Sequence, residues 1–432
     1  MRLLQLLQLG DIHYPQLRGK SAVVDQKDKA MDEKFVATVS ADKLQSVARA
    51  ICSALGQHHI AGILICGDLT SWGDIPGYKE CLNYLATFLN LGHADGPANA
   101  DVHVVPGNHD VDRSVCTPEN QDFYKKFEAI EKLWIDLQRP ILTVRDVRST
   151  TIANSNGRAQ IYSLNSCIGC GEKRSLPVNV QNDLYSILEA YSSRTTLEEA
   201  FGVVGEQLDT PAFVENHISS LVEELRQLDD FIIPIVLAHH NILPQAMPQV
   251  TVYTEVINAG LVRTRLLELQ QPVIYCHGHI HCDPIEILNL PSAAAGPVVS
   301  VSAPLLENGF NVLEIAFGQK NIPLGCRVIP YRARNDGSVV SRTAEIVRIP
   351  LRRADEYVKV GHDRLGDMLQ YVSAASHERF STVLDRARSQ SGTSLHEATV
   401  AETLREAEWL GLVSILNGED KPKHWHIMKS VP

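Results

Sequence analysis

The chain has 432 residues, of which 44% are hydrophobic and 21% are charged, a composition typical of globular proteins that excludes a disordered chain. Its formal net charge of −11 disfavours a surface built to coat duplex nucleic acid, because neutralising phosphates requires clustered lysines and arginines. The nine cysteines lack the regular spacing of a disulfide framework.

The sequence shows no run of about 18 apolar residues, which a membrane-spanning helix would need. The opening stretch MRLLQLLQLGDIH has an apolar run that two glutamines interrupt, and it lacks the small-residue cleavage site of a signal peptide. We therefore expect a soluble, cytoplasmic protein without a membrane partner.

The first hundred residues alternate between two periodicities. Apolar runs at 3–9, 61–66 and 102–105 predict buried strands, whereas residues 40–55 and 78–89 show helical spacing. Ser40 is the expected N-cap of the first helix. This alternation predicts crossover connections and a mainly parallel sheet.

Between about 115 and 235 the alternation of strand and helix patterns becomes less regular. We interpret this region as an insertion that shapes a substrate pocket. Within it, 159–166 predicts a strand and 211–228 an amphipathic helix. Further buried strands are expected at 232–238, 272–276, 298–303 and 310–317. Residues 325–349 predict a hairpin that turns at Asn335-Asp336-Gly337.

Beyond about residue 352 the pattern becomes helical, so we expect one domain at 1–351 and an accessory domain at 352–432. Three helical stretches, the last capped by Gly411, and a hairpin suggest a winged-helix-like module; a helical appendage packed on the larger domain is the alternative. The third stretch carries Glu397, Glu402, Glu406 and Glu408 against Arg405. Phosphate would repel such a helix, which favours contact with a protein partner or self-association.

Five predicted strands are each followed by side chains that commonly bind metals. These side chains are Asp11 and His13, then Asp68, then Asn108, His109 and Asp110, then His239 and His240, and finally His277, His279 and His281. Because the carboxyl ends of parallel strands meet at one edge of a sheet, residues about 270 positions apart can form one site.

Carboxylate, imidazole and amide oxygen suit divalent ions such as Mn, Fe, Zn or Co. The candidates are too many for one ion but suit two ions that share a bridging carboxylate. Two metals about 3.5–4 Å apart can activate a water and hold the oxygens of a phosphoryl group. The sequence thus predicts a two-metal centre for phosphoryl chemistry.

The order Asp-x-His, Gly-Asp-x₄-Gly, Gly-Asn-His-Asp, a later His and Gly-His-x-His resembles the calcineurin-like metallophosphoesterase superfamily, over roughly residues 1–350. The resemblance implies an α/β fold with a β-sandwich flanked by helices. It also implies metal-binding roles for Asp11, His13 and His281 at one metal, Asp68 as the bridge, and Asn108, His239 and His279 at the other. His109 would contact the phosphoryl group and protonate the leaving oxygen, and Asp110 would orient its imidazole.

The implied activity is phosphoester hydrolysis by in-line attack of a metal-bridging hydroxide, and we expect a phosphodiesterase acting on a nucleotide-type small molecule. A DNA or RNA nuclease guided by the C-terminal domain is one alternative, although the charge counts against nucleic acid. A non-catalytic, metal-bound scaffold is another.

Three features outside the implied set need an interpretation. The pair CIGC at 167–170 has the spacing of half a zinc site but no matching Cys or His pair, so we expect buried structural cysteines. His240 and His277 are interpreted as residues that lie beside the metal site and do not bind the metals. Asp112 and Arg113 either line the site or form a surface salt bridge.

Overall fold

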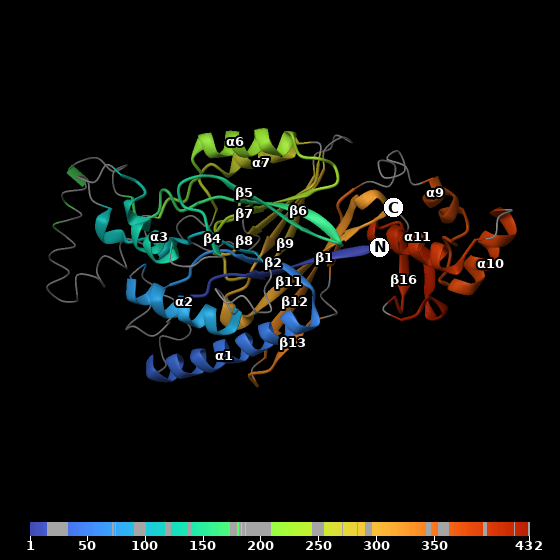
Figure 1. Cartoon of the computed structure of the whole chain (residues 1–432), viewed down its shortest axis with the longest axis horizontal. Helices are drawn as coiled ribbons and strands as arrows, with labels where there is room; N and C mark the ends of the chain where they lie inside the picture. Colours follow the sequence, from blue (N-terminus) through green and yellow to red (C-terminus); the bar gives the residue numbers. More distant parts are fainter. Residues whose placement is uncertain are drawn as a thin grey trace.

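The structure is a computed structural model. It describes residues 1–14, 33–70, 73, 75–89, 101–116, 122–135, 140–172, 179–180, 183, 186, 209–243, 255–269, 271–282, 284–289, 296–334, 336–342, 347–352, 363–391, 395–418 and 420–430. Two sheets carry the large part of the chain, helices cover them, and a smaller C-terminal unit lies at one end (Figure 1).

The first sheet has eight strands in the order β13-β12-β11-β1-β2-β3-β4, with β14 also paired to β12. Its strands are β1 (Arg2–Leu9), β2 (Ile60–Ile65), β3 (Asp101–Val104), β4 (Pro140–Leu142), β11 (Gly309–Phe317), β12 (Pro323–Ala333), β13 (Val339–Ser341) and β14 (Val347–Pro350). Strands β1 to β4 run parallel, whereas β11 is antiparallel to β1 and to β12. The sheet is therefore mixed.

The second sheet has six strands in the order β5-β6-β7-β8-β10-β9. Its strands are β5 (Arg148–Asn154), β6 (Gly157–Ser163), β7 (Ile233–Leu237), β8 (Val273–His277), β9 (Ile285–Leu288) and β10 (Val298–Ser302). The four inner strands are parallel to one another, and the two edge strands pair with them antiparallel.

A shared apolar core joins the two sheets face to face. Leu6 of β1 and Leu64 of β2 belong to the same buried cluster as Ile161, Ile235 and Ile274 of the second sheet. A second cluster packs α1 (Glu33–Gln57), α2 (Ile75–Leu89) and residues around α3 (Glu128–Ile135) on the outer face of the first sheet. A third packs α6 (Glu215–Arg226) and α7 (Ala259–Leu267) on the second sheet. The result is a four-layer α/β sandwich.

The predicted strands and helices are found, and they form the β-sandwich flanked by helices that the family resemblance implied; both sheets are mixed, whereas periodicity alone indicated a mainly parallel sheet. Continuous apolar runs mark buried strands without saying which sheet holds each one, and the chain divides them between two mixed sheets. The predicted cap at Ser40 is wrong, because α1 already begins at Glu33. The predicted hairpin is present as β12 and β13, although Asn335 in its turn lies outside the described residues.

Much of the predicted insertion belongs to the sandwich itself. Strands β4, β5 and β6 and helix α6 all lie between 115 and 235, and β6 is an inner strand of the second sheet. Residues 173–178 and most of 181–208 lie outside the described residues. An added, pocket-shaping segment must therefore be shorter than predicted.

In its described residues the C-terminal unit contains three α-helices and a three-stranded sheet of order β15-β17-β16. Its elements are α9 (Asp363–Gln370), β15 (Glu378–Arg379), α10 (Phe380–Ser391), α11 (Glu397–Trp409), β16 (Val413–Leu416) and β17 (His426–Lys429). The predicted glycine cap of α11 is confirmed, because Gly411 has a φ of 73° and the Leu412 amide donates to the Ala407 carbonyl at 2.8 Å.

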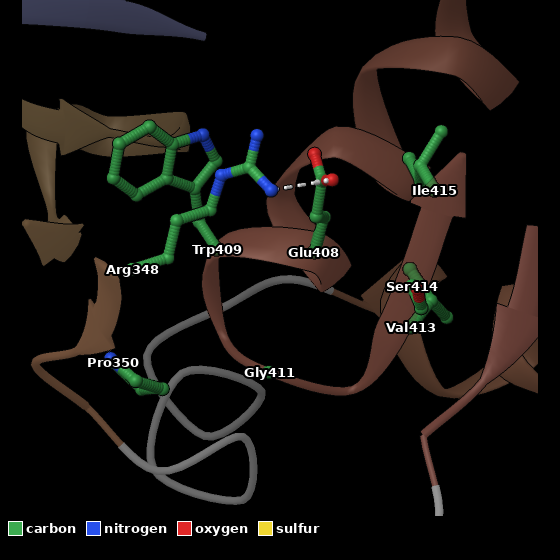
Figure 2. Close-up of a pocket in the computed structure, with 8 residues that line it drawn as sticks. All are labelled: Arg348, Pro350, Glu408, Trp409, Gly411, Val413, Ser414 and Ile415. Atoms are coloured by element: carbon green, nitrogen blue, oxygen red, sulfur yellow. Dashed lines mark hydrogen bonds and ion pairs between the residues drawn. The ribbon is translucent and has the colours of Figure 1, made fainter. Parts of the chain in front are cut away.

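This unit packs against β12, β14 and the N-terminal residue, on the first sheet's side of the molecule. Leu324 of β12 is fully buried in the same apolar cluster as Leu404 of α11. The amino group of Met1 pairs with Glu402 at 2.6 Å, and Arg348 of β14 pairs with Glu408 at 3.1 Å. A pocket of about 210 Å³ lies in this interface, and the Arg348–Glu408 pair forms part of its wall (Figure 2).

The docking site lies at the opposite end of β1 from the first candidate metal ligand. Met1 stands before this strand and Asp11 follows it, and a strand of eight residues spans about 26 Å. Figure 1 shows the same arrangement, with the N-terminus beside α11 and β16. None of the described helices combines the length and apolarity that a bilayer crossing needs.

We predict that Leu324→Ala lowers the free energy of unfolding by about 2–5 kcal/mol, because it opens a cavity between the sheet and the C-terminal unit. Chemical denaturation measures the change. The matched control is Leu416→Ala, whose side chain is 50% exposed and should cost less than about 0.5 kcal/mol. Equal stability of the two variants would show that the unit does not pack on β12.

Candidate metal centre

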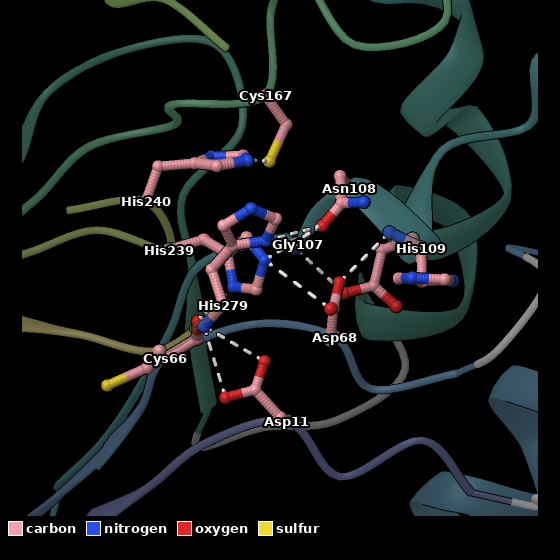
Figure 3. A network of polar contacts seen from close by, with 12 residues as sticks. Asp11, Cys66, Asp68, Gly107, Asn108, His109, Cys167, His239, His240 and His279 are labelled. Atoms are coloured by element: carbon pink, nitrogen blue, oxygen red, sulfur yellow. Dashed lines mark hydrogen bonds and ion pairs between the residues drawn. The ribbon is translucent and has the colours of Figure 1, made fainter. Parts of the chain in front are cut away.

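The carboxyl ends of strands from both sheets meet at one place. The structure brings all seven predicted ligands together there: Asp11 follows β1, Asp68 follows β2, Asn108 follows β3, His239 follows β7, and His279 and His281 follow β8, while His13 stands two residues beyond Asp11. Figure 3 shows side chains of both sheets converging on Asp68 and Asn108.

The backbone at these residues is strained. Asp11, His13, Asp68, His279 and His281 have φ values between 46° and 70°, and they make up five of the eight non-glycine residues with positive φ in the described part of the chain. Such a conformation is disfavoured for residues with a Cβ and is held only where the surroundings enforce it. Strain therefore concentrates at the predicted ligands, as is typical of a functional site.

Two glycines make room for the carboxylates. A Cβ on Gly107 would lie 2.0 Å from Oδ1 of Asp68, and a Cβ on Gly278 would lie 2.7 Å from Oδ2 of Asp11. Real side-chain carbons do not come this close to an oxygen. The glycines of the GNHD and GHIH motifs are thus needed because backbone and carboxylate are in direct contact.

One group of ligand atoms comes from Asp11, His13, Asp68 and His281, and these atoms all lie within 4.8 Å of one another. Nε2 of His13 is 3.5 Å from Oδ2 of Asp68, and Nε2 of His281 is 3.6 Å from Oδ1 of Asp11. These distances are too long for good hydrogen bonds. They suit two ligands that share one ion at about 2.0–2.2 Å from each.

A second group is centred on the amide oxygen of Asn108. This oxygen is 3.0 Å from Nε2 of His239 and 3.1 Å from Nδ1 of His279. Oδ2 of Asp68 is 3.4 Å from the same His239 nitrogen, so Asp68 faces both groups. Nδ1 of His239 lies 2.7 Å from the carbonyl of Cys66, which fixes the ring with Nε2 turned toward the centre.

Buried polar atoms test whether this centre fits a pair of cations. Both ring nitrogens of His13 and Oδ2 of Asp68 are buried and have no hydrogen-bond partner among the described residues. Leaving a carboxylate oxygen dry and unpaired is costly, and a cation removes that cost. Carboxylate, imidazole and amide donors are also those that divalent transition ions prefer. The residues therefore fit the predicted metals.

The pKa values of three predicted ligands favour the protonation states that bind a metal. Burial lowers the pKa of His13 and of His279 well below the usual value, so both rings are neutral and have a free lone pair. Burial would raise the pKa of Asp68, but attraction to His239 outweighs it and holds this pKa well below its usual value. Asp68 is therefore ionised, as a bridging ligand must be.

His109 lies beside the first group with its side chain partly exposed. Its ring centroid is 4.8 Å from that of His13, in an edge-to-face arrangement, and its backbone amide donates to Oδ1 of Asp68 at 2.9 Å. This placement puts a partly exposed imidazole next to the centre.

The role predicted for Asp110 needs correction. Its carboxylate accepts hydrogen bonds from the amides of Gly107 at 2.9 Å, Leu69 at 3.0 Å and Thr70 at 3.0 Å. These bonds tie the loop after β2 to the loop after β3, and burial raises the pKa of Asp110 to about 6. Asp110 thus holds two ligand-bearing loops together, and among the described residues its carboxylate bonds to these backbone amides, where the prediction had it orient the ring of His109.

Asp209 is a functional residue that the sequence did not reveal. Its Oδ2 accepts a hydrogen bond from Nδ2 of Asn108 at 3.1 Å and pairs with Arg113 at 2.6 Å, while its Oδ1 accepts from the Gly171 amide at 2.8 Å. Because it takes the amide hydrogens of Asn108, the amide oxygen is turned toward the two histidines. Asp209 stands in no motif, so only spatial proximity identifies it.

The remaining histidines behave as neighbours of the centre. His277 is hydrogen bonded at both nitrogens, to the Gly278 carbonyl and the Ser300 hydroxyl, each at 3.1 Å. His240 directs Nδ1 toward the Ser166 hydroxyl at 2.9 Å. Arg113 pairs with Asp209, which also contacts Asn108, so of the two alternatives left open for Arg113 the position beside the site is the one found.

Comparisons with known proteins identify the family of this chain. The family described as calcineurin-like phosphoesterase matches residues 4–283. Among solved structures, a dimetal phosphatase from Danio rerio is 11% identical, with 82% of this chain and 100% of that chain covered and a TM-score of 0.46. A 5′-nucleotidase precursor from Thermus thermophilus is 12% identical, with 87% and 61% covered and a TM-score of 0.40. The NAD nucleotidase of Haemophilus influenzae is 12% identical, with 95% and 68% covered and a TM-score of 0.39. No curated protein sequence matches the chain.

We predict that Asp209→Asn weakens Mn²⁺ binding about 10–100-fold, because one acceptor oxygen cannot serve Asn108, Arg113 and Gly171 together. Competition with a chelator of known affinity measures the change. Asp101→Asn, at an exposed position of β3, is the matched control and should bind Mn²⁺ like the parent protein. If Asp209→Asn also binds Mn²⁺ like the parent, Asn108 does not depend on Asp209.

We also predict that metal binding releases at least one proton at pH 7. Burial lowers the pKa of His239, but attraction to Asp68 outweighs it and raises this pKa to about 9 in the metal-free protein. The protonated ring stabilises the metal-free fold below the ordinary pKa of 6.5, and this contribution is lost as the pH rises through about 9.

A metal must displace that proton, so apparent affinity should increase from pH 7 toward pH 9 and then level off. Calorimetric titration in two buffers of different ionisation enthalpy counts the protons released. Binding heats that do not depend on the buffer would contradict this prediction.

Proposed function

The chain belongs to the calcineurin-like phosphoesterase family, and from this premise we propose that it is a two-metal phosphodiesterase acting on a nucleotide-type small molecule. One observation carries the proposal: Oδ2 of the buried Asp68 lies 3.5 Å from Nε2 of His13 and 3.4 Å from Nε2 of His239. A single carboxylate that serves two histidine-bearing groups is what a binuclear centre requires.

Each group of residues would hold one divalent ion. Asp11, His13 and His281 would bind the first, Asn108, His239 and His279 the second, and Asp68 both. The bound pair would supply a water of lowered pKa as nucleophile and neutralise charge on the phosphoryl oxygens. The ions would be Mn, Fe, Zn or Co, in keeping with the donor set.

His109 would act on the side of the leaving group. Its amide bond to Asp68 fixes the backbone beside the centre, and its partly exposed ring can reach a bound ester. A neutral or protonated imidazole at this place can contact a phosphoryl oxygen and give a proton to the departing oxygen. Asp110 would support His109 only indirectly, by holding the two loops together.

The charges around the centre support a diester over a monoester. Among the described residues no lysine or arginine pairs with Asp11 or Asp68, and Arg113 is paired with Asp209. A phosphomonoester brings two negative charges and a diester one, so the described part of the centre, where no such cation pairs with these ligands, suits the diester better.

We propose that residues 352–432 form a separate, winged-helix-like domain for protein contact or self-association. The order α9, β15, α10, α11, β16, β17 supports that description. The third helix is not free to enter a nucleic-acid groove, because Glu402 and Glu408 pair with Met1 and Arg348 of the large domain. The domain also docks at the far end of β1 from Asp11, which counts against a nuclease that it would guide.

The decisive experiment compares substrates on the Mn²⁺-loaded protein. We predict turnover of bis-p-nitrophenyl phosphate that exceeds turnover of p-nitrophenyl phosphate and of a single-stranded oligonucleotide. His109→Gln should lower kcat about 10²–10⁴-fold with metal content unchanged, since it removes a proton donor and no ligand. Asp68→Asn should lose both metal and turnover.

His59→Gln, at an exposed position, is the matched control for His109→Gln and should keep the parental kcat. Cleavage of the oligonucleotide alone would replace the proposal with a nuclease. Two bound metals without turnover of any of the three would support the scaffold instead.

A further inference from the structure

A second cluster of metal-binding side chains lies next to the candidate centre. Cys167 and Cys170 follow β6 and are fully buried, and His240 follows β7 and is fully buried as well. One donor atom from each of the three lies within 4.8 Å of the others. The sequence offered no partner for the Cys-x-x-Cys pair; the fold supplies one from 70 residues further along the chain.

The turn that carries the two cysteines is held in place from both sides. The Cys167 amide donates to Oδ1 of Asn165 at 2.8 Å, and the Cys170 amide donates to the Cys167 carbonyl at 3.0 Å. The ammonium of the buried Lys126 donates to the carbonyls of Ile168 at 2.6 Å and Cys170 at 2.8 Å. The positions of the two thiols are therefore set by the backbone before any ion arrives.

The geometry suits a tetrahedral ion. Sγ of Cys167 is 3.8 Å from Nδ1 of His240, and Figure 3 shows the two side chains pointing toward each other. Zinc bound to sulfur at about 2.3 Å and to nitrogen at about 2.0–2.1 Å places the two donors about 3.5 Å apart. The same nitrogen is hydrogen bonded to the Ser166 hydroxyl at 2.9 Å, and the Cys167 thiol donates to the Pro106 carbonyl at 3.3 Å, so an ion would replace both contacts and take a water as its fourth ligand.

We propose that Cys167, Cys170 and His240 bind a third metal ion, Zn²⁺, directly beside the two-metal centre, because a donor atom of His240 also lies within 4.8 Å of donors of His239 and His279. Two thiolates and an imidazole are the donors that select zinc over harder ions such as Mn²⁺. On binding, each thiol gives its proton to solvent and its sulfur lone pair to the ion. The site joins the loop after β6 to the residue next to His239.

The inference does not rest on the proposed hydrolase activity, because the donors are different and the readout is spectroscopic. Cobalt(II) replaces zinc and gives an intense sulfur-to-cobalt absorption in the near ultraviolet only when thiolates bind it. The oxygen and nitrogen donors of the two-metal centre give no such band. Reconstitution of the metal-free, reduced protein with Co²⁺ therefore reports on this cluster alone.

We expect the parent protein to show the thiolate band and to bind three equivalents of metal. Cys170→Ala should lose the band and one equivalent. Cys326→Ala is the matched control, because Cys326 is also buried but lies in the core between the sheets, and it should keep both. Thermal melting of the metal-free variants checks that each is folded.

Alkylation of the parent protein tests the site without any substitution. Because both thiols are buried, the test is run in mild denaturant: Zn²⁺ should slow alkylation of Cys167 and Cys170 and leave that of the buried Cys326 unchanged, as mass mapping of the peptides would show. No thiolate band in the fully reconstituted parent, or a band that survives in Cys170→Ala, would overturn the proposal and leave a hydrogen-bonded trio without an ion.

Discussion

The rest of the structure depends on one buried carboxylate oxygen, Oδ2 of Asp68, which lies between two histidine rings without a good hydrogen bond in the part of the chain that the structure describes. Oδ2 of Asp68 is buried, has no donor among the described residues, and faces imidazole nitrogens on two sides. In the metal-free protein, attraction to the protonated His239 offsets part of the cost of burying this charge, and metal cations would take over that role. The left-handed backbone at five ligand residues and the close approach of Gly107 follow from the same demand, because the loops must bring acidic oxygens and rings to one point.

That demand explains why the chain needs two sheets. Asp11, Asp68 and Asn108 end strands of the first sheet, whereas His239 and His279 end strands of the second. Ligands from one sheet edge alone would lie roughly in a row, since neighbouring strands are about 4.8 Å apart. Ligands on the facing edges of two sheets can instead surround a pair of ions from both sides. The apolar core between the sheets therefore sets the distance across the site, and packing and metal geometry are coupled through residues such as Leu64 and Ile235.

The features that could be predicted are those that a local sequence pattern encodes, namely the strands and the candidate ligands. Apolar runs located the strands, and the residues that follow them supplied the candidate ligands, since a ligand at a strand end is adjacent in sequence to the element that positions it. Sheet membership was not predictable, because an inner strand of either sheet has the same buried run. Asp209 was missed for a related reason: it reaches Asn108 across 101 positions of sequence and has no motif around it. The resemblance paired Asp110 with the imidazole of His109, whereas its carboxylate accepts hydrogen bonds from amides of the loop after β2.

The segment between β6 and β7 shows how much of the site's support lies in stretches that carry no family motif. It contributes Asp209, which sets the amide of Asn108, and Ser166 and Cys167, which contact the ring of His240 beside His239. Lys126 anchors the same turn through backbone carbonyls. Ligands on strained loops need such anchors, because a backbone held at positive φ relaxes unless its neighbours are fixed. Residues that bind no metal of the two-metal centre, such as Asp209 and Lys126, therefore help to fix the positions of its seven predicted ligands.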